Sequence, residues 1–161
     1  MFEIRPAQDH ELAAVGDLTV AAYADFTLGP ADPYVAKLRD AEARAREAEL
    51  WVARSSAGSV AGGVTWCPPG SVWREISQPG EGEFRMLAVS PTAQGQGMGE
   101  ALARHCIELS RAAGDSAMVI SSLTGMAAAH RLYGRLGFER LPERDWSPAP
   151  GVELIAFRLA Y

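Results

Sequence analysis

The sequence predicts an α/β fold built on a mixed sheet, with parallel crossovers in the second half of the chain. Strand-like stretches follow one another between residues 50 and 89, and beyond them helices and strands alternate, as in a parallel crossover. The chain has 161 residues, of which 48% are hydrophobic and 22% charged, the balance of a globular protein with a sizeable core. We therefore expect residues 1–161 to form a single domain.

The first half of the chain shows strand and helix patterns separated by turn signals. Its strands are short alternating or apolar runs, predicted over residues 2–5, 50–54 and 59–66, with the last two joined as a β-hairpin. Helices are predicted over residues 9–26, from a loose apolar periodicity, and over residues 34–49, from their Ala, Glu and Arg content. Asp40–Arg44 and Glu42–Arg46, each one turn apart, indicate that the second helix has a solvated face.

In the second half, residues 68–82 are rich in Pro and Gly and are predicted to form a long loop before the central strand, residues 83–89. Helices are predicted over residues 98–113 and 125–136, because each carries an apolar stripe and is followed by glycine. The first stripe comprises Met98, Leu102, His105, Leu109 and Ala113. The remaining strands are predicted over residues 117–121, 138–141 and 152–161, with a loop over residues 142–151.

Charge and cysteine content exclude several classes of function. The net charge of −5 argues against a nucleic-acid or anionic-membrane partner. Cys67 and Cys106 form no CxxC pair and the three histidines have no ligand spacing, so we expect neither a metal site nor a disulfide. The sequence begins without a basic-then-apolar segment and has no apolar run of membrane-spanning length, which leads us to expect a cytoplasmic location.

A glycine-rich turn, Gln94-Gly95-Gln96-Gly97-Met98-Gly99, joins the central strand to the next helix. The first amides of a helix have no partner within the helix, and the helix dipole makes that end electropositive. Glycines there let an anion approach the amides closely. By itself, the pattern also fits a turn that merely lets helix and strand pack tightly.

A second motif lies on the last predicted helix: Ala129, then Tyr133 four residues later, then Gly137-Phe138. With both motifs in this order, the chain resembles the GNAT superfamily of acyl-coenzyme A N-acyltransferases over essentially its whole length. The family's phosphate loop is Arg or Gln, two residues, Gly, one residue, then Gly or Ala, which Gln94, Gly97 and Gly99 match. The resemblance implies a central mixed, mostly antiparallel, twisted sheet of about seven strands flanked by about four helices.

The resemblance also implies a binding site for acetyl-coenzyme A. Backbone amides of Gln94, Gly95, Gln96, Gly97, Met98 and Gly99 would hold the pyrophosphate. Backbone groups of Leu87, Ala88 and Val89, where the central strand splays at a bulge, would bind the pantetheine arm and the thioester carbonyl. Two positions depart from the common pattern. Met126 stands where many members have an Asn that contacts the cofactor, and Gln94 replaces the commoner Arg.

Two catalytic residues follow from the same resemblance. Tyr133 falls at the general-acid position and would protonate the leaving thiolate; its alternative role is a core aromatic on an amphipathic helix. Glu83 is the candidate general base, and its alternative role is an exposed strand-end charge paired with Arg85. Other carboxylates remain open as the base: Asp145, Glu143 and Glu75.

We therefore expect an N-acetyltransferase that moves an acetyl group to a primary amine of a small molecule or peptide by direct attack in a ternary complex, with Cys67 structural. The acceptor wall would come from the loops at residues 27–33 and 142–151, and the second loop holds Glu143, Asp145 and Trp146, which could bind an amine. Four aromatic residues could add to it or simply pack: Tyr23, Phe26, Trp66 and Trp73. A homodimer is compatible with this interpretation. The alternatives are a non-catalytic acyl-coenzyme A sensor and a phosphate- or nucleotide-binding protein, although Gly-Lys-Ser/Thr is absent.

Overall fold

The computed structural model describes all 161 residues and contains eight strands and five α-helices. The strands are β1 (Phe2–Pro6), β2 (Glu49–Ser55), β3 (Val60–Cys67), β4 (Glu81–Val89), β5 (Ala117–Leu123), β6 (Glu139–Arg140), β7 (Trp146–Ala149) and β8 (Val152–Ala160). The helices are α1 (Leu12–Tyr23), α2 (Pro33–Arg39), α3 (Ala41–Glu47), α4 (Met98–Ala112) and α5 (Ala127–Leu136). None of them is both long and apolar enough to cross a bilayer.

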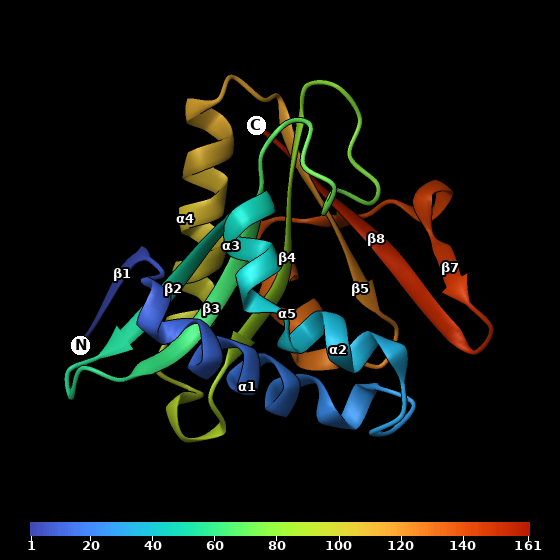
Figure 1. The fold of residues 1–161 in the computed structure, drawn as a ribbon. Coiled ribbons are helices and arrows are strands. Elements are labelled where there is room, and N and C mark those ends of the chain that lie inside the picture. The colour runs from blue at the N-terminus through green and yellow to red at the C-terminus, as the bar shows by residue number, and fades with distance from the viewer.

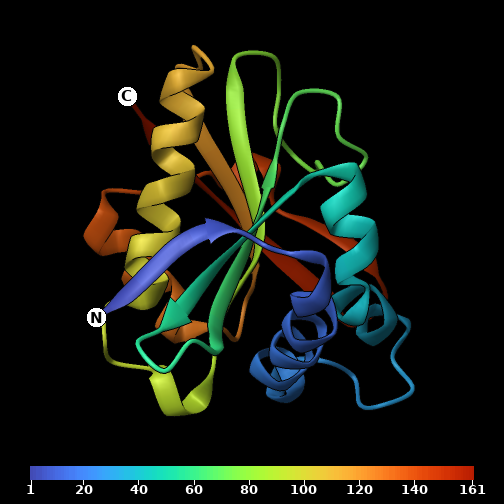
Figure 2. The ribbon, with the colours of Figure 1, turned by 60° about the vertical axis from the view of Figure 1, so that its left-hand side comes forward.

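The strands form one twisted sheet in the order β1-β2-β3-β4-β5-β8-β6, with β7 paired to β8 (Figure 1). Helices α1, α2 and α3 cover one face, and α4 and α5 cover the other (Figure 2). The largest apolar cluster lies under α4 and α5, and two smaller ones lie under α1 to α3. This architecture confirms the predicted mixed sheet, with eight strands instead of about seven and five helices instead of about four.

The sheet opens at its centre, between β4 and β5. These two strands are its one parallel pair, joined by the crossover helix α4, and they pair only from Glu81 to Glu83, opposite Ala117 to Val119. Beyond Glu83, β4 continues along β3, whereas β5 continues along β8 as far as Leu123. The backbone of β4 from residue 84 onward therefore has no strand partner on the β5 side.

A β-bulge lies on β4 at the same point. Thr65 and Gly63 of β3, two residues apart, face Arg85 and Ala88 of β4, three residues apart, so β4 carries one extra residue. Met86 takes φ 53°, which side chains other than glycine seldom adopt. As a result, Phe84 packs in the core under α4 and α5, whereas Met86 packs in the core under α1 and α2.

The helix predicted over residues 34–49 is in fact two helices. The chain breaks at Asp40, whose carboxylate caps α3 by accepting a hydrogen bond from the backbone of Ala43 at 3.0 Å. Arg44 is fully buried and donates to the Leu38 carbonyl and the Thr65 hydroxyl, at 2.8 and 3.1 Å. The predicted solvated pair between Asp40 and Arg44 was therefore wrong, because Asp40 caps the helix and Arg44 points inward.

Two further expectations needed correction. The loop predicted over residues 142–151 contains strand β7. This strand is short, contains Pro148 and pairs with β8 through a register break, so its sequence shows no regular strand pattern. The apolar stripe predicted on α4 is correct at Met98 and Leu102. Beyond Leu102 the buried positions differ from the predicted ones, because Cys106 and Ile107 are buried and Ala113 is exposed. The buried face of α4 follows a spacing of four residues more closely than the predicted stripe did.

The approach of α1 to α2 depends on a glycine. A Cβ atom at Gly16 would lie 2.3 Å from the carbonyl oxygen of Arg39, at the end of α2. We expect Gly16→Ala to lower the free energy of unfolding by about 1–3 kcal/mol through overpacking. Gly134 on α5 is the matched control, because a Cβ there meets nothing within 4 Å. Gly134→Ala should raise stability by roughly 0.5–1 kcal/mol, since alanine favours helix. Denaturant unfolding of both variants measures this difference, and equal effects would contradict the packing explanation.

Candidate functional site

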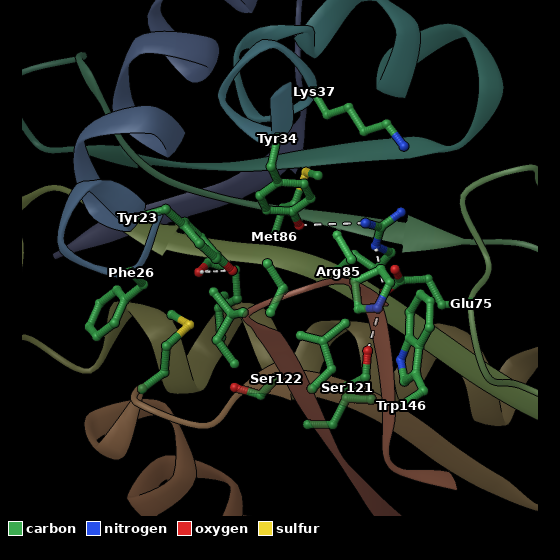
Figure 3. Close-up of a pocket in the computed structure, with 18 of the residues that line it drawn as sticks. Tyr23, Phe26, Tyr34, Lys37, Glu75, Arg85, Met86, Ser121, Ser122 and Trp146 are labelled. Atoms are coloured by element: carbon green, nitrogen blue, oxygen red, sulfur yellow. Dashed lines mark hydrogen bonds and ion pairs between the residues drawn. The ribbon is translucent and has the colours of Figure 1, made fainter. Parts of the chain in front are cut away.

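A cavity of about 380 Å³ lies where β4 and β5 separate (Figure 3). Its walls come from five parts of the chain: α1 to α2, the loop before β4, the two separating strands, α5, and the β7–β8 hairpin. Residues of β5 on both faces of the sheet line it, including Ser121 and Ser122. The cavity therefore reaches both faces of the sheet through the opening between the strands.

One wall of the cavity carries an ion pair. The carboxylate of Glu75 lies 3.1 Å from Nε of Arg85 and accepts a hydrogen bond from the Ser121 hydroxyl at 3.2 Å. Arg85 also donates to the carbonyl of Trp73 at 3.1 Å and reaches the Tyr34 hydroxyl at 3.5 Å. Burial raises the pKa of Glu75 above its ordinary value, although Arg85 opposes the shift. A carboxylate with a raised pKa, facing a cavity, is suited to accept a proton.

Glu83 lies outside this cavity. Its side chain is fully buried, and its carboxylate accepts hydrogen bonds from the backbone N–H groups of Glu75, Ile76 and Ser77, at 3.0–3.3 Å. Glu83 is thus neither exposed nor paired with Arg85, whose partner is Glu75. The carboxylate holds the loop that presents Glu75 to the cavity.

Tyr133 is a core aromatic residue that also lines the cavity. Its ring packs against Phe84, Phe138 and Phe157, with centroid distances of 5.7–6.1 Å, and only 6% of the residue is exposed. The residue also lines the cavity, and its hydroxyl has no hydrogen-bond partner within the protein. Burial raises the pKa of Tyr133, so the phenol keeps its proton at neutral pH. The core fixes the ring and leaves the hydroxyl free to act as a donor.

A second polar pair lies near Tyr133. One turn before it on α5, Nε2 of His130 lies 3.1 Å from the hydroxyl of Ser122, which is buried and lines the cavity. The ring of His130 packs on Phe157 at 5.2 Å, and burial lowers the pKa of His130. The histidine is therefore neutral at pH 7. No role for this pair could be predicted from the sequence, because only the fold brings the two residues together.

The glycine-rich turn has the geometry of an anion site. Gly95 and Gly97 both take φ 80°, and a Cβ atom at either would meet nothing within 4 Å, so the approach to their amides is open. Gln94, Gly95, Gln96 and Gly97 are exposed, and the 15-residue helix α4 starts at Met98. The side chain of Met98 is buried in the core, so only its backbone faces the turn.

Residues Leu87, Ala88 and Val89 connect this turn to the cavity. They form the end of β4, beyond the last residue that pairs with β5. Ala88 is buried, and the carbonyl of Leu87 accepts a hydrogen bond from the hydroxyl of Tyr23 at 3.4 Å. An unpaired strand edge can bind an extended ligand as a further strand. The bulge predicted from the resemblance is present, one residue earlier, at Met86.

Several other predicted wall residues lie elsewhere. Asp145 pairs with Arg140 at 2.7 Å and does not line the cavity, and neither does Glu143. Tyr23, Phe26 and Trp146 do line it, whereas Trp66 and Trp73 do not. The lining residues without a predicted role in the wall include Tyr34, Lys37 and Arg85. No three His, Cys, Asp or Glu side chains come together as a metal-binding group.

Comparison with known proteins places the chain in a family. The model of the acetyltransferase (GNAT) family matches residues 15–138. A mycothiol acetyltransferase from Mycolicibacterium paratuberculosis is 34% identical over 146 residues, which cover 83% of this chain and 43% of that protein. This chain spans between 27% and 59% of the length of the curated relatives that it matches.

Solved structures share the fold. A GNAT-family acetyltransferase from Staphylococcus aureus superposes with a TM-score of 0.78 at 11% identity, over 99% of both chains. The Salmonella typhimurium protein yncA, solved with its cofactor acetyl-CoA, superposes with a TM-score of 0.68 at 24% identity, over 99% of this chain and 94% of that one. With a family model that covers most of its length, this chain belongs to the GNAT family of acetyltransferases.

Proposed function

We propose that this chain, acting as a single domain, transfers an acetyl group from acetyl-coenzyme A to a primary amine of a small molecule or peptide. The observation that carries the proposal is the cavity through the sheet. Its lining includes a half-buried carboxylate, Glu75, and a phenol without a hydrogen-bond partner, Tyr133. Attack on a thioester needs a proton acceptor for the amine and a proton donor for the thiolate, and this cavity offers both.

The glycine-rich turn and the end of β4 are the proposed donor site. Amides of Gln94 through Gly99 would hold the pyrophosphate, because Gly95 and Gly97 leave them open and α4 starts there. The unpaired edge of Leu87, Ala88 and Val89 would hold the pantetheine arm, whose amides can pair with backbone. The yncA structure with acetyl-CoA supports the choice of donor for this fold.

Two residues of the cavity, Glu75 and Tyr133, would each carry out one of the two proton transfers. Acetyl-coenzyme A supplies the reactive thioester carbonyl. The amine nitrogen forms the new C–N bond, the C–S bond breaks, Glu75 takes the proton of the amine, and Tyr133 gives a proton to the sulfur. Glu75 is favoured over Glu83 as the base because Glu75 faces the cavity, whereas three backbone amides occupy Glu83.

Direct attack is favoured over a covalent acyl-enzyme. Cys67 is fully buried, and burial raises the pKa of its thiol to about 12, so it stays protonated at neutral pH. Cys106 is buried as well, and its pKa is raised in the same direction. Neither thiol lines the cavity. Both are therefore poor nucleophiles, and a ternary complex needs none.

The first test removes the phenol. Tyr133→Phe should lower the rate of free thiol release by about 10²-fold or more, the usual contribution of a general acid, while coenzyme A affinity stays within a factor of a few. The fold should persist because the ring keeps its packing against Phe84, Phe138 and Phe157. Stopped-time thiol release and calorimetric binding measure the two quantities. Unchanged turnover would reject the assigned role and favour a non-catalytic acyl-coenzyme A sensor.

The second test compares the two glutamates. Activity should be present above the raised pKa of Glu75 and should fall as the pH drops through it, because the base must be deprotonated. Glu75→Gln should lower turnover by about 10²-fold or more and remove this acidic limb from the profile of kcat against pH. Glu83→Gln should chiefly lower the melting temperature, since it weakens the bonds that hold residues 75–77. The opposite pattern would make Glu83 the base.

The third test concerns the anion site. Gly97→Ala should weaken coenzyme A binding by about 10-fold or more, because a methyl group would crowd the amides. Gly114→Ala is the control: φ there is 85°, a Cβ also meets nothing within 4 Å, and the residue lies beyond the far end of α4. Both variants should lose roughly 1–2 kcal/mol of stability from the left-handed backbone. Equal losses of affinity would place the pyrophosphate elsewhere.

A further inference from the structure

One charged side chain of the cavity has no partner. Four charged residues line the cavity, and three of them are engaged. Asp32 caps α2 by accepting from the backbone of Leu28 and Tyr34, and Glu75 pairs with Arg85. Lys37 on α2 makes no ion pair and no hydrogen bond. Figure 3 shows it extending over the wall that carries Tyr34 and Arg85.

A second cation lies behind the same wall. Arg44 is fully buried, and its hydrogen bonds go to two threonine hydroxyls and a carbonyl instead of a carboxylate. Its Nε has no partner at all. Arg44 is close enough to influence the phenols of Tyr23 and Tyr34, which line the cavity. Burial lowers the pKa of Arg44 to about 10, which leaves it charged at neutral pH.

The wall formed by α2 and β4 thus carries two cations that form no ion pair. The carboxylate of Glu75 pairs with Arg85, whereas neither Lys37 nor Arg44 forms an ion pair. Lys37 lies close enough to Glu75 to lower the pKa of that carboxylate, and Asp40 raises the pKa of Arg44 in the same way. The carboxylate of Glu83 accepts hydrogen bonds from three backbone amides of the loop before β4. A buried cation is normally paired, but Arg44 forms no ion pair, and the exposed ammonium group of Lys37 is free to bind an anion that enters the cavity.

The opposite end of the cavity is apolar and partly open. Phe26 lines it and remains 37% exposed, which is unusual for a large aromatic side chain. Figure 3 shows Phe26 on the side of the cavity away from Lys37, Arg85 and Glu75. Met126 also lines the cavity, and the residue before it, Gly125, lies beside the Phe26 ring. The methionine stands where many members of the family have an Asn. An acceptor that spans the cavity would therefore place apolar atoms at this end.

We infer that the acceptor is a primary amine that carries a carboxylate and an apolar body, as an apolar amino acid does. Lys37 binds the carboxylate, with Arg44 adding to the field behind it, and the amine lies at Glu75. The apolar group lies against Phe26 and Met126. This inference rests on the proposed function and names the class of its acceptor. It makes Lys37 the residue that selects for the carboxylate.

The experiment compares amines that differ only in the carboxylate. Phenylalanine is matched with phenethylamine, and leucine with isoamylamine, in a thiol-release assay at fixed acetyl-coenzyme A. We expect kcat/KM to be about 10- to 100-fold higher for the carboxylate-bearing member of each pair, the usual effect of a charged hydrogen bond. In Lys37→Met this ratio should fall toward one.

The control variant is Arg39→Met. Arg39 lies two residues beyond Lys37 on the same helix, is exposed, and pairs with Asp17 instead of lining the cavity. In Arg39→Met, the ratio of kcat/KM between the carboxylate-bearing amine and its neutral match should stay at the wild-type value. A fall of the same size in Arg39→Met would mean that general surface charge, and not Lys37, sets the preference.

Binding separates this inference from the proposed function. N-Acetylphenylalanine should bind the wild-type protein at least 10-fold more tightly than N-acetylphenethylamine, and Lys37→Met should abolish the difference. Turnover of neutral amines at equal or higher kcat/KM would overturn the inference and leave the proposed function standing. If no amine releases thiol, the proposed function fails, and equal binding of the two acetylated probes then overturns the inference as well.

Discussion

The short parallel pairing of β4 with β5 is the constraint on which the site depends. Three residue pairs join the strands, and beyond Glu83 each strand follows a different neighbour. The opening leaves the backbone of β4 unpaired, creates the cavity and gives it access to both faces of the sheet. The bulge at Met86 then turns consecutive side chains toward the same wall, which lets Arg85 reach Glu75. Hydrogen bonds that a regular sheet would form are given up here, and a ligand can replace them.

Glu75 reaches the cavity because other residues hold a loop in place. The loop before β4 has no regular secondary structure, yet the carboxylate of Glu83 accepts hydrogen bonds from three of its amides, and Arg85 forms an ion pair with its Glu75. Arg74 adds hydrogen bonds to the carbonyls of Cys67 and Glu81. Together these contacts tie the loop to β3 and β4. A proton acceptor can thus lie on a loop and still have a defined position.

The features that could be predicted from the sequence are those with local causes. The glycine-rich turn and the helix after it depend on residues within a few positions, as do the strands and the amphipathic helix of Tyr133. The break at Asp40 was missed because a capping aspartate and an ordinary helix residue give the same composition. The burial of Arg44 and the partnership of Glu75 with Arg85 were missed because distant elements create them. The lack of an ion pair at Lys37 could not be predicted either, because it depends on which partners the other charged residues of the cavity have in the fold.

The bonds between Glu83 and residues 75–77 also bear on how this scaffold could be altered. The loop does not determine its own shape, because the group that organises it belongs to the neighbouring strand. A loop transplanted from another protein would keep its conformation only if a carboxylate at position 83 came with it. Conversely, selection would retain this glutamate for the sake of the loop in any relative that shares it. Retention of Glu83 among such relatives would then say nothing about which residue moves the proton.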